Sequence, residues 1–342
     1  MRDDVRVLVL GTGHMGSGIA RLLLDKRGVA LVGAFARRAE RAGMDVGAAI
    51  GLERDLGLPV GVDLAALIER ARPDVAIQAT CSRISDAMAE LTTLVRHGVH
   101  VISIAEEMAY PACSSPAFAD ELHWLAVARG VTVLGTGVNP GFVMDLLAVT
   151  LTNVCADVGS IRIRRSNDLS PYGPTVLRTQ GVGLDPDGFR AGLETGEVVG
   201  HVGFPASIAM IAAALGWEID RVEETREPIV SEVARSTPFI EIAPGQTAGC
   251  RHTAVGYRAG DPVITLVHPQ QVQPEAEGSD TEDVIEIDGE PELRWVSHPE
   301  VPGGVATAAL AAGYVTRVVE AAPGLTSMIE LPPARRPIRR AT

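Results

Sequence analysis

Hydrophobic residues in the first half of the chain follow two alternating patterns. Short runs rich in valine and isoleucine, typical of buried parallel strands, alternate with longer segments whose apolar residues recur at helical spacing. The first example is Val5–Leu24 (VRVLVLGTGHMGSGIARLLL), where an apolar run ends in a glycine-rich turn and continues into a helical pattern. This succession of strand, turn and helix predicts an α/β domain with a parallel sheet.

The same alternation continues to about residue 151 and predicts the remaining elements of this domain. We expect strands over residues 29–35, 60–62, 75–80, 99–105 and 130–137, and helices over residues 45–56, 63–72, 84–97, 115–129 and 145–151. Glycines within 45–56 weaken that helix prediction. The domain is therefore expected to be a doubly wound parallel sheet of the Rossmann type.

The pattern changes near residues 142–155, which marks a domain boundary. Residues 161–167 alternate apolar with polar side chains, as in an antiparallel sheet with one wet face. We expect helices over 188–195 and 205–215, strands over 219–233, 240–243, 248–257, 263–268, 284–287 and 293–298, and an exposed acidic turn over 273–283.

Three regions follow from this change of pattern. Residues 1–145 form the dinucleotide-binding domain, and residues 146–301 form a second, α+β domain with a mainly antiparallel sheet for substrate binding and dimerisation. Residues 302–330 contain an alanine-rich helix that is expected to return and pack on the first domain, because such an apolar helix must be covered. The basic segment 334–340 is expected to be loose.

The glycine turn has the spacing GxGxxG. Gly11 permits the tight turn, Gly13 allows the backbone to approach a pyrophosphate, and Gly16 allows the helix to pack closely on the strand. Unsatisfied N–H groups and the positive end of the helix dipole favour an anion there. A purely structural turn is the alternative. The residues expected to bind the cofactor are Gly11, Thr12, Gly13, His14, Met15 and Gly16.

The end of the second strand predicts which nicotinamide cofactor binds. An acidic residue at this place accepts a hydrogen bond from the ribose 2′-hydroxyl of NAD, whereas arginine holds the 2′-phosphate of NADP. This chain has Ala36 followed by Arg37 and Arg38. We therefore expect NADP(H) to be preferred, with NAD(H) possible. The alternative is that both arginines are solvated residues at a helix start.

Polar residues also follow the later strands, at the sheet edge where ligands bind. Ala79, Thr80 and Cys81 are expected to line the cofactor, as is Asn139 in the turn after residue 137. Cys81 could equally be a small buried residue. Two carboxylates, Glu106 and Glu107, follow the strand over 99–105 and could act as a general base or hold a cationic amine. The alternative is a solvated helix start.

Composition excludes several functional classes. The 342 residues are 46% hydrophobic and carry a net charge of −13, which disfavours nucleic acid or an acidic membrane as partner. We expect no membrane span, and the short apolar run at the N-terminus does not resemble a signal peptide. The four cysteines lack zinc spacing, so we expect no metal site, reduced thiols and a cytoplasmic protein.

Several longer motifs carry a family resemblance. The chain resembles the 2,4-diaminopentanoate dehydrogenases and the related native amine dehydrogenases, which lie within the dihydrodipicolinate-reductase-like two-domain enzymes. The motifs are ISIAEEMAYP (102–111), GTGVNPGFVMD (135–145), NDLSPYGPTVLRTQGVG (167–183), HVGFPASI (201–208), AGCRHTA (248–254) and HPQQ (268–271).

The resemblance implies reversible oxidative deamination of an amine to a ketone and ammonia with NAD(P)+. It also implies that a glutamate in the 102–111 segment is catalytic, with Glu106 matching best and Glu107 second. At Ala36 this chain departs from the many family members that carry an acid there, which favours NADP(H). Further candidates for the substrate pocket are Phe142, Asn167, Tyr172, Thr175, Gln180, His201 and His268.

Other functions of the same architecture remain open. One is a dihydrodipicolinate-reductase-like enzyme that reduces a C=N bond or a semialdehyde, although no HHxxKxD-like stretch is present. Another is a non-catalytic protein that senses NADP(H). A homodimer formed through the sheet of the second domain is expected from fold analogy alone.

Overall fold

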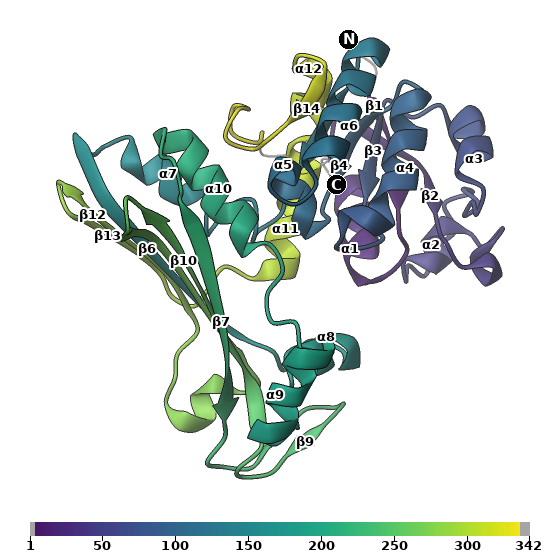
Figure 1. The fold of residues 1–342 in the computed structure, drawn as a ribbon. Coiled ribbons are helices and arrows are strands. Elements are labelled where there is room, and N and C mark those ends of the chain that lie inside the picture. Colours follow the sequence, from purple (N-terminus) through teal and green to yellow (C-terminus); the bar gives the residue numbers. More distant parts are fainter. Residues whose placement is uncertain (1–3, 336–342) are drawn as a thin grey trace. The chain divides into compact units, whose positions relative to one another are not determined.

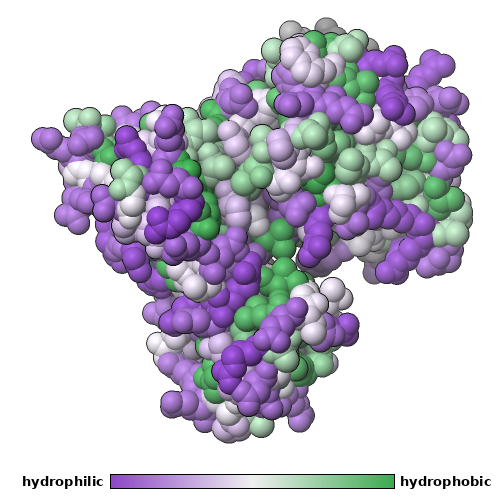
Figure 2. All heavy atoms as spheres, in the orientation of Figure 1, coloured by the Kyte–Doolittle hydropathy of each residue, from purple (hydrophilic) through white to green (hydrophobic). Residues whose placement is uncertain are grey.

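The structure is a computed structural model that describes residues 4–335. Its residues divide into two compact units (Figure 1). The first unit holds the described residues up to Phe142 and those from Pro302 onward, and the second holds Val143–Val301. Figure 2 shows mainly hydrophilic residues on the visible faces of both units, with hydrophobic residues in smaller groups.

The first unit is built on a six-stranded sheet in which every neighbouring pair is parallel. Its strand order is β14-β5-β4-β3-β1-β2, the arrangement of a doubly wound sheet, so the predicted fold class is confirmed. The strands are β1 (Val5–Leu10), β2 (Val29–Phe35), β3 (Val75–Gln78), β4 (His100–Ser103), β5 (Thr132–Gly135) and β14 (Gly324–Thr326).

Helices cover this sheet in two layers (Figure 1). Helices α3, α4 and α6 pack side by side, and α1, α11 and α12 form the other group. The helices are α1 (His14–Leu24), α2 (Val46–Ala49), α3 (Leu64–Ala71), α4 (Ile84–Arg96), α5 (Pro111–Ser114), α6 (Pro116–Arg129), α11 (Gly303–Gly313) and α12 (Val315–Glu320), with short 3₁₀ turns η1 (Ala39–Arg41) and η2 (Glu106–Ala109).

The core of this unit is aliphatic. Leu8, Leu10, Leu91, Val101 and Val133 are among its fully buried members, which come from both the sheet and α4. Burying each such side chain stabilises the fold by about 1.5–3 kcal/mol. Burial of all of β3 and β5 and of the last four residues of β1 explains why these strands are mainly apolar rather than alternating in the sequence.

The predicted strand over 60–62 is wrong. Gly61 makes only an isolated parallel bridge to Phe35, because the chain then turns into α3, whose N-cap is Asp63. The helix predicted over 45–56 is reduced to α2. The Asp45 carboxylate accepts hydrogen bonds from the N–H groups of Gly47, Leu56 and Leu58, which bends the chain back after one turn.

The second unit contains a six-stranded mixed sheet of order β13-β12-β6-β11-β10-β7, in which only the β6–β11 pair is parallel. This agrees with the predicted, mainly antiparallel sheet. Its elements are β6 (Asp157–Asp168), β7 (Arg221–Val230), β10 (Thr247–Arg258), β11 (Asp261–Gln271), β12 (Glu282–Glu290), β13 (Leu293–Ser297), the small pair β8 (Arg235–Ser236) and β9 (Glu241–Ile242), helices α7 (Leu146–Thr152), α8 (Pro174–Thr179), α9 (Pro186–Thr195) and α10 (Phe204–Leu215), and the turn η3 (Pro274–Glu277).

The acidic segment 273–283 is not simply an exposed turn. Glu277 forms an ion pair with the buried Arg235. Asp283, in β12, is fully buried and forms an ion pair with Arg165 of β6. Its many acidic residues suggested solvent exposure, but two of them neutralise arginines that the fold buries. Residues 336–340 of the basic segment lie outside the described part of the chain.

Candidate active site

The glycine turn lies where the ends of β1, β2 and β3 meet. The Gly11 N–H donates to the Phe35 carbonyl at 2.8 Å, and a Cβ at Gly11 would lie 2.5 Å from the Ala79 carbonyl oxygen. A Cβ at Gly16 would lie 2.0 Å from the Gly11 carbonyl oxygen, so only glycine allows α1 to start this close to the turn. Nothing lies within 4 Å of the Cβ position of Gly13, which leaves room for a ligand.

The start of α1 has the features of an anion site. Gly13 is its N-cap and supplies no side-chain hydrogen bond, and the first turn contains no acidic residue. Its first N–H groups and the helix dipole are therefore available to a phosphate. Exposed His14 and partly exposed Met15 form the first turn, and Thr12 binds the Ser17 hydroxyl through its carbonyl. These residues fit the pyrophosphate of a dinucleotide.

At the end of β2, the two arginines lie in different surroundings. Ala36 is buried, and Arg37 binds Glu90 of α4, with 2.7 Å between Nε and Oε1. The bond to Glu90 raises the pKa of Arg37 further above its already high value. Arg38 is exposed, and its side chain forms no hydrogen bond or ion pair with residues 4–335.

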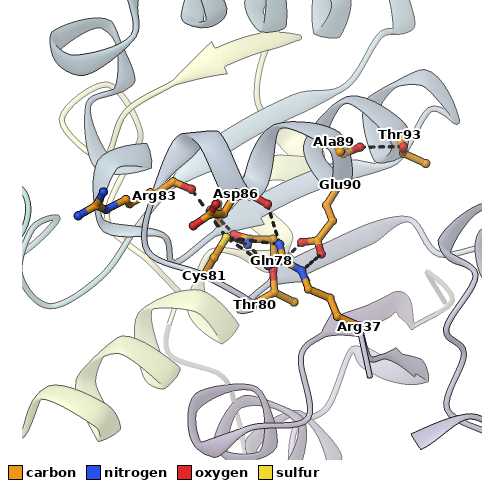
Figure 3. A network of polar contacts seen from close by, with 10 residues as sticks. Arg37, Gln78, Thr80, Cys81, Arg83, Asp86, Ala89, Glu90 and Thr93 are labelled. Atoms are coloured by element: carbon orange, nitrogen blue, oxygen red, sulfur yellow. Dashed lines mark hydrogen bonds and ion pairs between the residues drawn. The ribbon is translucent and has the colours of Figure 1, made fainter. Parts of the chain in front are cut away.

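A polar network follows β3 (Figure 3). The Thr80 hydroxyl donates to Glu90 Oε2 at 2.5 Å, and the Gln78 amide donates to Thr80 Oγ1 and to Cys81 Sγ. The Ser103 hydroxyl of β4 donates to Gln78 Oε1 at 2.6 Å. Cys81 is therefore not merely a small buried residue, since its sulfur lies in a network that joins β3, β4 and α4.

The structure separates the two adjacent glutamates, which both lie in η2 after β4. Glu107 Oε2 accepts the Ile84 N–H at 2.7 Å, so this carboxylate caps the N-terminus of α4. Burial raises the pKa of the Glu106 carboxyl above its ordinary value, and the Ser82 side chain and the backbone N–H oppose this shift. Glu106 is therefore the better candidate for a proton-transferring residue.

The turn after β5 lies at the same carboxyl edge of the sheet. Asn139 is partly buried there, and Gly141 adopts a φ of +128° while its Cβ position lies 2.6 Å from the Gly137 nitrogen and oxygen. Only glycine fits this closed turn. Partly exposed Phe142 ends the first unit. The predicted cofactor and catalytic residues of this unit thus follow its strand ends.

In the second unit, three histidines cluster around Phe204; His252 and His268 are buried, and His201 is half-buried. The ring of His201 lies 5.0 Å from that of His268 and 4.8 Å from that of Phe204, and His252 lies 4.7 Å from Phe204. His268 Nε2 donates to Asn167 Oδ1 at 2.8 Å. His201, His268 and Asn167, which are far apart in the sequence, are therefore brought together.

Burial lowers the pKa of all three histidines, which favours their neutral forms, and for His252 the bond to Glu224 opposes this shift. Burial and the nearby positive groups lower the pKa of His201 to about 3 and that of His268 well below its ordinary value. His252 Nδ1 accepts the His201 N–H, so His252 Nε2 carries the proton and donates to Glu224. Nε2 of His201 is buried and has no hydrogen-bond partner within residues 4–335.

Of the remaining substrate candidates, Gln180 is linked to this cluster. The Gln180 amide donates to the Gly200 carbonyl next to His201. Burial raises the pKa of Tyr172, and the Arg165 charge opposes that shift. Thr175 is exposed in α8, and nothing in the structure links it to the histidines.

Several charged residues of these sites were not singled out from the sequence. They are Glu90, Arg165, Glu224, Arg226 and Asp283, and all take part in ion pairs. One signal was available: with a period of two, Arg165 follows Ile161 and Ile163 on the inward face of β6. An arginine on that face requires a buried acid, and Asp283 is that acid, at 2.6 Å.

Two absences concern the described residues. Between residues 4 and 335 no group of three histidine, cysteine or acidic residues is placed to hold a metal ion. None of the helices in that range is both long and apolar enough to span a membrane.

Comparison with known proteins confirms the family resemblance. Residues 142–340 match the model of the 2,4-diaminopentanoate dehydrogenase C-terminal domain, and residues 5–104 match that of the dihydrodipicolinate reductase N-terminus. The chain is 40% identical to the 2,4-diaminopentanoate dehydrogenase of Acetoanaerobium sticklandii, over 97% of this chain and 95% of the relative.

Two amine dehydrogenases are also similar. That of Streptomyces virginiae is 26% identical over 96% of both chains. The solved structure of the amine dehydrogenase from Mycobacterium smegmatis has a TM-score of 0.86 and 28% identity, and the alignment covers 98% of each chain. Since one family model spans more than half of the chain and a relative is 40% identical over nearly all of it, the chain belongs to the 2,4-diaminopentanoate dehydrogenase family.

Proposed function

We propose that this protein interconverts an amine with a ketone and ammonia, using a nicotinamide dinucleotide and Glu106 as the acid and base. Membership of its family makes it an oxidoreductase that acts on amines. The observation that carries the role of Glu106 is the contrast between the two half-buried glutamates after β4: Glu107 is occupied as a helix cap, whereas desolvation raises the pKa of the Glu106 carboxyl.

The first unit fits a dinucleotide. The open space at Gly13, the start of α1 and the exposed Arg38 would hold its pyrophosphate and its adenosine ribose, and Ala79, Thr80, Cys81 and Asn139 follow the neighbouring strand ends. When bound, the nicotinamide accepts a hydride from the amine carbon or returns one to it. With arginines rather than an acid after β2, we propose that NADP(H) is preferred and NAD(H) is also used.

Glu106 has two tasks in this proposal. In its ionised form it takes a proton from ammonium or from the attacking amine, and it stabilises the positive charge of an iminium group in surroundings of low polarity. In its protonated form it returns the proton when water leaves the carbinolamine. A raised pKa lies closer to physiological pH than that of an ordinary glutamate, so more of the protonated form is present beside the ionised one.

The neutral histidine cluster of the second unit is proposed to recognise the substrate. His201, His268, Asn167 and Gln180 offer uncharged donors and acceptors, which suit an amine or a ketone oxygen. That Phe142, Tyr172 and Thr175 contact the substrate stays a prediction. We also propose that the protein is cytoplasmic and forms a homodimer; light scattering after size-exclusion chromatography tests the dimer.

The test is a coupled assay of NADP+ and NAD+ reduction with 2,4-diaminopentanoate, cyclohexylamine and short alkylamines. The expected result is amine-dependent reduction, with ammonia-dependent oxidation of NADPH in reverse. A reductase acting on a C=N bond or a semialdehyde would instead consume NADPH without ammonia. A protein that only senses NADP(H) would bind the nucleotide and turn over none of these substrates.

A further inference from the structure

Arg37 leaves the end of β2 and reaches across to α4 (Figure 3). Its Nε donates to Glu90 Oε1 at 2.7 Å, and its Nη2 donates to the Asp86 carbonyl at 2.7 Å and approaches Cys81 Sγ at 3.6 Å. One edge of the guanidinium group is therefore fixed by the protein. Within residues 4–335 the Nη1 amino group makes no hydrogen bond, and the Arg37 side chain is 42% exposed.

Within residues 4–335, Arg37 is the cation that pairs with Glu90, and no second cation is placed to release it. Glu90 is 8% exposed. It lies on the face of α4 that packs on the core, beside Ala87, Leu91 and Leu94. Its second carboxylate oxygen accepts the Thr80 hydroxyl at 2.5 Å. A buried carboxylate that loses its cation is strongly disfavoured, so Glu90 keeps the guanidinium in place.

The ion pair changes what this edge offers to an anion. Arg37 and Glu90 together carry no net charge, and a phosphate that binds Nη1 also feels the negative charge of Glu90 through weakly screened surroundings. Of the two arginines after β2, Arg38 is then the one whose charge no acid of residues 4–335 neutralises. An edge with two arginines in the sequence thus has a weaker attraction for a 2′-phosphate than their number suggests.

We propose that Glu90 is a positioning residue that sets coenzyme selectivity: by binding Arg37 it limits the affinity for the 2′-phosphate of NADP(H) and lets NAD(H) compete. This rests on the proposed dinucleotide site. Position 36 has no acid that could bind the ribose. Glu90 of α4 instead contributes a carboxylate that binds Arg37.

The test measures binding of two fragments that lack the nicotinamide, 2′,5′-ADP and 5′-AMP, by calorimetry on the full chain. In the wild type, 2′,5′-ADP should bind less than about tenfold more tightly than 5′-AMP, because one of the two arginines is neutralised. Glu90→Gln should raise the affinity for 2′,5′-ADP roughly tenfold and change that for 5′-AMP less than about twofold. Glutamine keeps the shape and can still accept from Arg37 and donate to Thr80.

Asp86→Asn is the matched control. It removes the same charge one helical turn earlier. The Asp86 side chain is exposed, and Asp86 contacts Arg37 through its backbone carbonyl. The ratio of the affinities for 2′,5′-ADP and 5′-AMP should therefore stay within about twofold of the wild-type ratio. In an Arg37→Gln background, Glu90→Gln should also change the ratio less than about twofold, because no guanidinium group is left to release.

Three results would overturn the inference. They are a wild-type preference for 2′,5′-ADP above about a hundredfold, an unchanged ratio in a folded Glu90→Gln variant, or an equal shift in Asp86→Asn. The wild-type measurement decides the matter even if Glu90→Gln does not fold. If neither fragment binds to the wild type, the proposed dinucleotide site fails as well, and this outcome is distinct from an unchanged ratio.

Discussion

Changing Glu106 and Glu107 to glutamine, one at a time, should give opposite effects on turnover and stability. If Glu106 transfers the proton, Glu106→Gln should lower kcat by about 10²–10⁴-fold, the usual contribution of a general base. Glu107→Gln should keep kcat within about tenfold of the wild type, because that side chain caps α4 at 2.7 Å from the Ile84 nitrogen.

The expected stability changes follow from the same contacts. Glu107→Gln removes a negative charge from the N-terminus of α4, a loss of about 0.3–1 kcal/mol. For a domain of this size, that lowers Tm by about 1–4 °C. Glu106 behaves differently, because burial raises the pKa of its carboxyl in the folded state. The ionised form is then less stable in the fold than in the unfolded chain, so Glu106→Gln should be at least as stable as the wild type at pH 7.

The pH dependence gives a further check on Glu106. A carboxyl with a raised pKa stabilises the folded state below the ordinary glutamate pKa of about 4.3, and this contribution is lost as pH rises through the raised value. Any stability gain of Glu106→Gln should therefore disappear toward pH 4. The acid limb of the wild-type kcat profile should lie above about pH 4.3 and should be absent from the residual activity of the variant.

The assays are steady-state turnover from pH 4 to 9, differential scanning calorimetry and calorimetric titration with NADPH. Nucleotide affinity should be nearly unchanged in both variants, so that lost turnover reports on chemistry. Near-wild-type kcat in Glu106→Gln, with intact NADPH binding, would refute the role of Glu106. A larger loss of kcat in Glu107→Gln would transfer the role to its neighbour.

Three further predictions concern other parts of the molecule. Gly16→Ala should prevent correct formation of the glycine turn, because its Cβ would lie 2.0 Å from a carbonyl oxygen, whereas Gly13→Ala should fold and lose nucleotide affinity; circular dichroism and NADPH titration distinguish these outcomes. Asp283→Asn should lower the free energy of unfolding by about 3–5 kcal/mol in urea, since it leaves the buried Arg165 without its acid, and a loss under about 1 kcal/mol would contradict this. Because the pKa of His201 falls to about 3 in the fold, stability should decrease as pH falls below about 6.5, and His201→Asn should make this decrease shallower in Tm measurements between pH 7 and 5.

Local chemistry explains which elements the sequence predicted well. The strand and helix on either side of the glycine turn were expected within Val5–Leu24 and are observed as β1 and α1. Hydrophobic period and glycine spacing are properties of neighbouring residues, so they can be recognised in one sequence. The strand predicted over 60–62 was wrong, since Gly61 pairs with β2 at a single residue before the chain turns into α3.

The sequence could predict a site residue where the residue directly follows the carboxyl end of a strand. Glu106 and Glu107 were both expected at the end of β4, but only the fold shows that Glu107 reaches Ile84, 23 residues earlier in the chain. Adjacent residues point in different directions, and the direction of each depends on which helix start lies nearby. The sequence could therefore nominate the pair and could not separate its members.

Charged residues show the limit most clearly, because the partner of a buried charge is set by tertiary structure. Arg37 and Glu90 are 53 positions apart, and no periodic pattern relates them. Arg37 next to Arg38 was interpreted from the sequence as two cations ready for a phosphate, yet α4 brings an acid to one of them. A count of arginines after β2 is thus an incomplete guide to coenzyme choice in a doubly wound fold. The relevant quantity is the charge that remains after the helix on that face of the sheet has contributed its own acids, and here Glu90 cancels the charge of Arg37 while Arg38 keeps its own.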